Sequence, residues 1–251
     1  MSKNLATLIG LSAILMWASM VGFVKHITTV IGPDVGITLI YSLSALLLLI
    51  IFRVPNFKLI SKKYLILGAI LFIAYELCFS FALAYSKTAQ QAIEVSIVNY
   101  LWPSLTVLAF VIFKELKFNI FIILGLIISS RVIDNFYSKP LSYILAFIGA
   151  IIWALYWVLT KKIGKGQNPI SIFFIGVALT LWLKLFFSGQ AVLPTLDLNT
   201  TLSLIFASTA IGLGYAAWNI GIIHGNTTML VVASYFTPII SSLLAMLVLQ
   251  T

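Results

Sequence analysis

The stretch IVNYLWPSLT at residues 97–106 places a proline, an amide and two large aromatic side chains in an otherwise apolar run. A proline inside a helix removes one backbone hydrogen bond and its ring clashes with the preceding turn, at a cost of about 3 kcal/mol. A second stretch, VASYFTPIIS at residues 232–241, has the same pattern, with Tyr235 in place of Tyr100 and Pro238 in place of Pro103. Two helices are therefore predicted to break at equivalent positions.

The amino-acid composition indicates whether these helices lie in water or in lipid. Of the 251 residues, 62% are hydrophobic and only 8% are charged, and the mean hydropathy is +1.14. A soluble domain carries about 25% charged residues, so this chain cannot cover itself with a water-compatible surface. We predict a polytopic membrane protein. Helices are the expected form, because lipid offers no partner to unpaired backbone groups.

Apolar runs that cross the hydrocarbon core need about 20 residues. The sequence contains nine candidate spans, at residues 5–24, 34–52, 64–86, 92–113, 118–130, 140–160, 169–187, 201–222 and 227–250. The fifth is short, because its roughly 13 apolar positions give about 20 Å of helix against a core of about 30 Å. All nine are read as membrane helices.

An offset of 136 residues runs through the chain, and it relates AILMWA at 13–18 to GAIIWA at 149–154. Five spans per half, an odd number, would insert the second half upside down, as in the inverted repeats of secondary transporters. We predict an all-α fold of two five-helix halves, residues 1–130 and 140–251. Ten helices are expected and about nine are present, because the last span would start at about residue 253, after Thr251.

The basic residues set the predicted orientation. One side of the membrane receives Lys3, Arg53, Lys58, Lys62, Lys63, Lys114, Lys117, Lys161, Lys162 and Lys165, and the other receives Lys25, Lys87, Arg131 and Lys139. Cytoplasmic loops are enriched in Lys and Arg, so the first side, which includes the N-terminus, is predicted to be cytoplasmic. We expect a multi-pass protein of the cell inner membrane.

Several classes of function find no support in the residues. The net charge of +9 is spread singly and in pairs between apolar runs, so no nucleic acid is expected as a partner. The single cysteine, Cys78, rules out an internal disulfide, and no phosphate-binding loop occurs. Two histidines offer little for a catalytic or metal set, so we expect no enzyme, no cofactor and no metal. A membrane scaffold without transport stays open as an alternative.

Aromatic and polar side chains gather on predicted helix faces near the middle of several spans. Flat rings with a polar tip suit stacking on an aromatic substrate, although helix packing and the interfacial aromatic belt are alternatives. We assign Tyr64 and Trp182, near span ends, to the belt. The residues predicted to line one central substrate cavity are Trp17, Tyr75, Glu94, Asn99, Tyr100, Trp102, Trp153, Trp157, Tyr215, Trp218 and Asn219.

Two carboxyl groups, those of Glu76 and Glu94, lie within predicted spans. A carboxylate at membrane depth is costly and is by default a functional candidate. On one continuous helix Glu94 would share an arc with Asn99 and Trp102, so it can receive a substrate ammonium or exchange a coupling proton. The alternatives are an ion pair with Lys87 for Glu94 and a neutral packing carboxyl for Glu76.

His224, in the sequence IIHGN, is the third candidate for coupling, because histidine titrates near neutral pH. Pro103 and Pro238 are the candidates for helix breaks that act in gating, since such breaks are tolerated only beside protein or a water-lined cavity. For a bound amino acid, we assign the ammonium to Glu94 or to the carbonyls freed by the two prolines. The carboxylate is assigned to Asn99 and Asn219.

Four stretches resemble the drug/metabolite transporter superfamily, of the EamA type: ATLIGLSAILMWASMVGFVK, QAIEVSIVNYLWPSLTVL, PLSYILAFIGAIIWALYWVLTKK and GYAAWNIGIIHGNTTMLVVASYFTPIISS. The resemblance implies a ten-helix inner-membrane carrier built from two inverted repeats. It also implies export of aromatic amino acids and related metabolites by alternating access. A broader amino acid, metabolite or drug exporter of the same superfamily is the alternative, and both facilitated diffusion and proton coupling stay open.

Overall fold

A computed structural model describes residues 1–113, 140–189 and 195–249. Its helices are α1 (Lys3–Ile31), α2 (Pro33–Phe52), α3 (Lys62–Ala84), α4 (Ala89–Asn99), α5 (Trp102–Ile112), α7 (Pro140–Ile163), α8 (Ile170–Phe187), α9 (Leu198–His224), α10 (Thr227–Ser234) and α11 (Thr237–Leu249). Seven helical segments in these ranges are long and apolar enough to cross a membrane. The protein is an all-α polytopic membrane protein. The predicted fifth span, residues 118–130, lies outside the described ranges.

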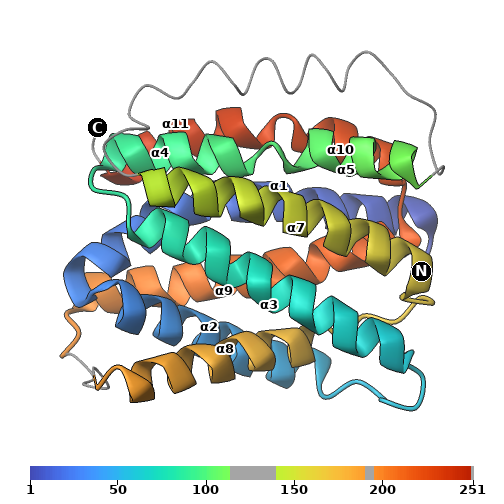
Figure 1. Ribbon diagram of the computed structural model, residues 1–251, viewed down its shortest axis with the longest axis horizontal. Helices are drawn as coiled ribbons and strands as arrows, with labels where there is room; N and C mark the ends of the chain where they lie inside the picture. Colours follow the sequence, from blue (N-terminus) through green and yellow to red (C-terminus); the bar gives the residue numbers. More distant parts are fainter. Residues whose placement is uncertain (114–139, 190–194, 250–251) are drawn as a thin grey trace.

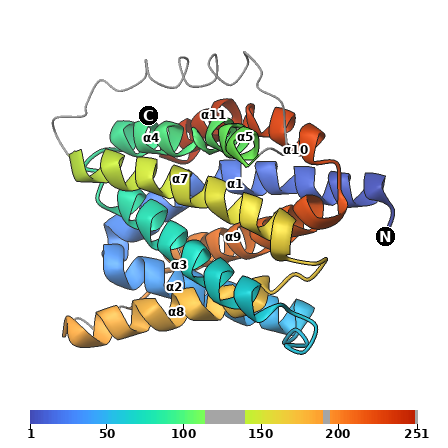
Figure 2. The same cartoon turned by 45° about the vertical axis from the view of Figure 1, so that its right-hand side comes forward.

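The helices form a bundle with three layers (Figures 1 and 2). Helices α2 and α8 form one side, α1, α3, α7 and α9 form the middle, and α4, α5, α10 and α11 form the other side. The most extensive helix pairs are α1 with α9 and α3 with α7. In the predicted repeat α7 is the counterpart of α1 and α9 that of α3, so each of these pairs is the counterpart of the other. The superposition of the two halves stays a prediction.

Each broken span is interrupted next to its proline. Helix α4 ends at Asn99 and α5 begins at Trp102, and the later pair is interrupted between Ser234 and Thr237. Because proline has no N–H, Pro103 leaves the carbonyl of Asn99 without its helical donor. Figure 1 shows the two broken spans running in opposite directions, with α4 beside α11 and α5 beside α10.

The backbones of α1 and α9 approach closely where the two helices cross. A Cβ built on Gly221 would lie 2.8 Å from the Cα of Gly10, so any larger side chain would push the helices apart. Small residues allow this kind of close packing between membrane helices. Further along α9, a Cβ on Gly214 would lie 2.8 Å from Nε1 of Trp17. The crossing therefore brings the Trp17 indole against α9.

A lysine bonds the end of a neighbouring helix at each end of the bundle. Lys25 of α1 donates to the carbonyl of Ser86, just after α3, and Lys161 of α7 donates to the carbonyl of Ile222 in α9 at 3.1 Å. Both lysines and both carbonyls are related by the 136-residue offset. An ammonium near a helix C-terminus stabilises the carbonyls there. This repeated contact supports the inverted repeat.

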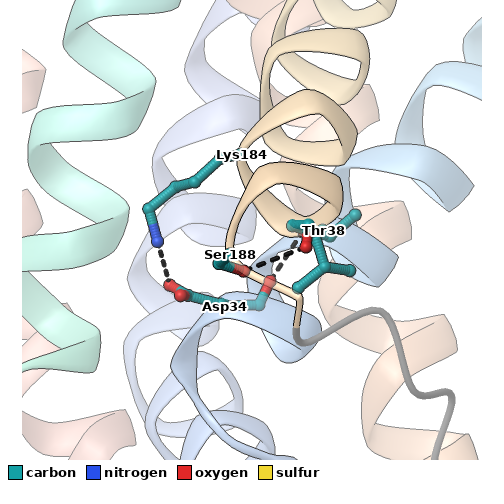
Figure 3. A network of polar contacts seen from close by, with 5 residues as sticks. Asp34, Thr38, Lys184 and Ser188 are labelled. Carbon is teal, nitrogen blue, oxygen red and sulfur yellow. Dashed lines mark hydrogen bonds and ion pairs between the residues drawn. The ribbon is translucent and has the colours of Figure 1, made fainter.

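The start of α2 and the end of α8, which lie at the end of the bundle opposite the N-terminus in Figure 1, are joined by an ion pair (Figure 3). The Nζ atom of Lys184 lies 2.6 Å from Oδ1 of Asp34 and 4.7 Å from the centre of the Phe81 ring. The hydroxyl of Thr38 donates to the carbonyl of Asp34 at 2.7 Å. Partly exposed pairs of this kind contribute about 0–1 kcal/mol, so this contact positions the helix ends more than it stabilises the fold.

The assignment of Tyr64 to the interfacial belt is wrong. Its side chain is fully buried, and its hydroxyl donates to Oγ1 of Thr160 on α7 at 3.1 Å. A position near the end of a span fixes the depth of a side chain in the membrane but not the helix face on which it lies, and Tyr64 lies on the face toward α7. Trp182 is 37% exposed, as a belt residue is.

Candidate functional site

Seven of the predicted lining residues form one network of ring contacts, six of them in the middle layer and Trp102 on α5 next to it. Trp153 lies at its centre, with ring centroids 4.8 Å from Tyr75, 5.9 Å from Trp17 and 5.3 Å from Tyr215. None of the seven is more than 5% exposed, so none faces lipid. We call this set the aromatic cluster: Trp17 of α1, Tyr75 of α3, Trp102 of α5, Trp153 and Trp157 of α7, and Tyr215 and Trp218 of α9.

Three further rings adjoin the aromatic cluster and are not among the predicted lining residues, although Tyr156 is on the same predicted helix face as Trp153 and Trp157. Tyr156 stacks on Trp153 at 5.1 Å, Phe72 meets Tyr215 edge-on at 5.3 Å, and Phe110 lies 6.3 Å from Trp157. Phe72 and Tyr156 lie three residues from cluster members on the same helix. That spacing places side chains on one helix face, so it is the signal that could have found them.

The aromatic cluster contains hydrogen-bond donors that have no partner. Nε1 of Trp17, of Trp157 and of Trp218 is buried without an acceptor among the described residues. A buried unpaired donor costs about 1–3 kcal/mol, and most buried polar atoms in proteins are paired. Three such donors in one ring network therefore indicate a place where an acceptor from outside the protein can bind.

Unpaired acceptors lie at the break between α4 and α5. The amide nitrogen of Asn99 donates to the hydroxyl of Tyr75 at 3.3 Å, while Oδ1 of Asn99 is buried without a partner. The hydroxyl of Tyr100 is also buried and unpaired among the described residues. Together with the Asn99 carbonyl left free by Pro103, these oxygens suit a cation. Asn99 thus presents an acceptor, whereas the sequence analysis assigned it to a substrate carboxylate.

Glu94 lies on α4, about 9 Å along the helix from Tyr100, and is 3% exposed. Its Oε2 accepts from the hydroxyl of Tyr143 at 2.6 Å and its Oε1 from the amide of Gln90 at 3.1 Å. Both donors are neutral. The predicted arc shared with Trp102 assumed one continuous helix, and the break at residues 100–101 invalidates that argument. Glu94 is buried beside α7 instead.

Asn219 is bonded on both sides of its amide. Its Nδ2 donates to the hydroxyl of Tyr156 at 2.9 Å and to Oδ1 of Asn168 at 3.0 Å, and its Oδ1 accepts from Tyr156 at 3.3 Å. The structure brings Asn219 next to the aromatic cluster only through Tyr156. A substrate carboxylate could bind Asn219 only by displacing these hydrogen bonds. Binding to the unpaired indole N–H groups displaces none.

The remaining coupling candidates lie apart from each other. Glu76 is 1% exposed on α3 and accepts a hydrogen bond from Tyr41 of α2. His224 is exposed as the last residue of α9. Within the part of the chain that the structure describes, no three His, Cys, Asp or Glu residues are grouped to hold a metal ion. Glu76 therefore shares the buried region with the aromatic cluster, and His224 does not.

Comparisons with known proteins agree with this architecture. The model of the EamA-like transporter family matches residues 140–251. The aromatic amino acid exporter YddG of Salmonella typhimurium (strain 14028s / SGSC 2262) is 42% identical over 267 residues, which cover 100% of this chain and 91% of the relative. YddG of Escherichia coli (strain K12) is 42% identical over 268 residues, covering 100% of this chain and 90% of the relative.

A solved crystal structure of a protein also has the same fold. It matches with a TM-score of 0.74 at 21% sequence identity, over 98% of this chain and 90% of the other. At this level of identity the likeness concerns the fold alone.

Proposed function

The chain belongs to the EamA-like transporter family and is an exporter of that superfamily, and we propose that its cargo is aromatic amino acids. The observation that carries this proposal is the buried aromatic cluster, whose rings come from five helices. The two relatives named above as aromatic amino acid exporters support it. We place the protein in the inner membrane with its N-terminus in the cytoplasm, following its basic loops.

Stacking between the rings of the aromatic cluster would select the side chain of the substrate. A good ring contact contributes about 0.5–1.5 kcal/mol beyond the burial of area. Two such contacts favour an aromatic over an aliphatic side chain by about fivefold to a hundredfold. Trp153 is the best placed ring for this, because it contacts members of the cluster on α1, α3, α5 and α9.

The two charges of an amino acid also need partners, because an unpaired charge in an apolar site is strongly unfavourable. The unpaired indole N–H groups of Trp17, Trp157 and Trp218 supply donors for the carboxylate. Oδ1 and the carbonyl of Asn99 supply acceptors for the ammonium, and Glu94 supplies a negative charge on the same broken span. Of these groups, the three indole N–H groups and Oδ1 of Asn99 have no hydrogen-bond partner among the described residues, whereas Glu94 is bonded to Tyr143 and Gln90.

Transport then follows by alternating access. The rings of the aromatic cluster contact one another in this structure, so a substrate must separate them, and the central cavity is a feature of the opened state. The breaks at Pro103 and Pro238 divide two spans into halves that can tilt separately. Movement of these halves opens the site to one side of the membrane at a time.

Counterflow of labelled phenylalanine in proteoliposomes tests the proposal. Unlabelled phenylalanine or tryptophan inside the vesicles should drive uptake of the label, whereas leucine and threonine should be at least about fivefold weaker. Phenylpropionate, which lacks the ammonium, and phenethylamine, which lacks the carboxylate, should each compete poorly. Equal competition by all amino acids would favour the broader exporter, and no counterflow with any of them would favour a scaffold.

A further inference from the structure

Glu76, Tyr41 and Ser80 form a buried polar group that the proposed substrate site does not use. The carboxyl of Glu76 is 1% exposed, and one of its oxygens accepts a hydrogen bond from the hydroxyl of Tyr41 on α2. The Tyr41 hydroxyl also lies 2.9 Å from Oγ of Ser80, one turn further along α3. The other carboxyl oxygen, Oε1, is buried with no hydrogen-bond partner among the described residues.

Among the described residues, no cation balances this carboxyl. The ionisable groups that face it are Tyr41 from α2, Tyr215 from α9 and Tyr75 of its own helix, and a tyrosine hydroxyl carries no positive charge in any state. Glu76 forms no salt bridge within the described ranges, where the ion pair of α2 and α8 joins Asp34 to Lys184 instead. An ionised carboxylate without a cation in an apolar interior is strongly unfavourable, so in this closed packing Glu76 holds a proton.

The carboxyl is linked to the aromatic cluster through Tyr215. The Tyr215 ring lies 4.9 Å from Trp17 and 5.3 Å from Trp153. Tyr75, adjacent to Glu76 in the chain, lies 4.8 Å from Trp153. A substrate that separates these rings must displace Tyr75 or Tyr215, and this opens a path for water to the carboxyl.

We propose that Glu76, with Tyr41 and Ser80, is the proton-coupling site of the transporter. The proposal rests on the proposed function, because the proton is exchanged for the aromatic amino acid. With the substrate-free cluster closed, the carboxyl is protonated. When the cluster opens for substrate, water reaches Glu76 and the proton leaves to that side. After the amino acid leaves on the outer side, the cluster closes and Glu76 takes up a proton from that side before the empty carrier returns. One proton thus enters the cell for each amino acid exported.

Glu76 is distinguished from the other two candidates by its surroundings. Glu94 accepts hydrogen bonds on both oxygens, from Tyr143 and Gln90, so neither oxygen is left unbonded as Oε1 of Glu76 is. His224 is exposed at the end of α9 and lies in contact with solvent or headgroups rather than with the cluster. Oδ1 of Asp34 is also buried without a hydrogen bond, but it is paired with Lys184. Among the described residues, Glu76 is thus the carboxyl whose buried oxygen has neither a hydrogen bond nor an ion pair.

Proteoliposomes with an acidic interior test the proposal, with valinomycin and potassium present to hold the membrane potential at zero. Outward flow of protons should drive labelled phenylalanine into the vesicles, to about tenfold accumulation for a gradient of one pH unit and one proton per substrate. Glu76→Gln should abolish this accumulation. At saturating phenylalanine its substrate-for-substrate counterflow should persist, since that exchange returns the carrier loaded and needs no proton, while its apparent affinity for phenylalanine falls because the neutral amide mimics the protonated carboxyl. Glu76→Asp should retain driven accumulation.

Tyr41→Phe provides a second variant should Glu76→Gln fail to fold. Removing the hydroxyl that bonds Glu76 should move the pH of half-maximal driven accumulation by at least about 0.5 unit, whereas a packing role would leave that pH unchanged. The proposal is overturned if wild type and Glu76→Gln accumulate phenylalanine equally, if the Tyr41→Phe midpoint does not move, or if only a sodium gradient drives accumulation. A wild type that shows no phenylalanine counterflow instead overturns the proposed function.

Discussion

Replacing Trp153 by alanine should lower counterflow of labelled phenylalanine by about tenfold or more and counterflow of threonine much less. The Trp153 ring contacts Tyr75, Trp102 and Tyr215, so its removal takes away the central stacking surface. Loss of two ring contacts amounts to about 1–3 kcal/mol of substrate binding. Rates measured with both amino acids in the same proteoliposome preparation give the ratio. Trp102→Ala should show the same preference with a smaller loss.

Two control variants separate stacking from folding. Trp182 is 37% exposed on α8, so Trp182→Ala removes a ring of the same kind outside the aromatic cluster and should leave both rates unchanged. Trp153→Phe keeps a ring and should recover part of the phenylalanine counterflow. If Trp153→Ala lowers phenylalanine and threonine counterflow equally, the tryptophan supports the gate or the fold, and the stacking account is wrong.

Glu94→Gln should lower phenylalanine counterflow by about tenfold to a hundredfold. The glutamine keeps the shape and an oxygen for Tyr143 but removes the negative charge that the proposal assigns to the substrate ammonium. Hydrogen bonds to charged groups contribute about 1.5–3 kcal/mol, which sets the expected loss. The apparent affinity for phenylalanine in the counterflow assay is the quantity to measure.

Glu76→Gln is the matched control, since it changes the other buried carboxyl. At saturating phenylalanine we expect counterflow by Glu76→Gln to stay close to wild type. Glu94→Gln instead loses affinity for phenylalanine and keeps its affinity for phenylpropionate, which has no ammonium. Equal and mild effects of the two substitutions would assign both carboxyl groups to packing.

The course of the helices could be predicted largely from the sequence. In lipid, hydrophobic runs have to be helices, and prolines can interrupt them only where the freed carbonyls find protein, so Pro103 and Pro238 located both breaks. It was harder to predict which face of each helix points into the bundle. Tyr64 and Trp182 both lie near span ends, yet Tyr64 bonds Thr160 inside the bundle and Trp182 is partly exposed.

The members of the aromatic cluster could be predicted because large rings with polar tips recur at one-turn spacing on α7 and α9. The hydrogen bonds could not, because they depend on which helix faces which. Asn219 bonds Asn168, from the loop before α8, and Glu94 bonds Tyr143 of α7. These partners lie about 50 residues away in the chain, and no local sequence pattern indicates them. The unpaired indole N–H groups likewise became visible only with the packing.

The central claim is that the aromatic cluster is the substrate site, and photolabelling tests it most directly. Labelled p-azidophenylalanine would be irradiated with the wild-type protein in proteoliposomes, and the modified peptides identified by mass spectrometry. The account predicts labels in the segments around Tyr100–Trp102, Trp153–Trp157 and Tyr215–Trp218, suppressed by excess phenylalanine and not by threonine. Labels confined to exposed rings such as Phe186 and Phe187 on α8, unaffected by phenylalanine, would contradict it.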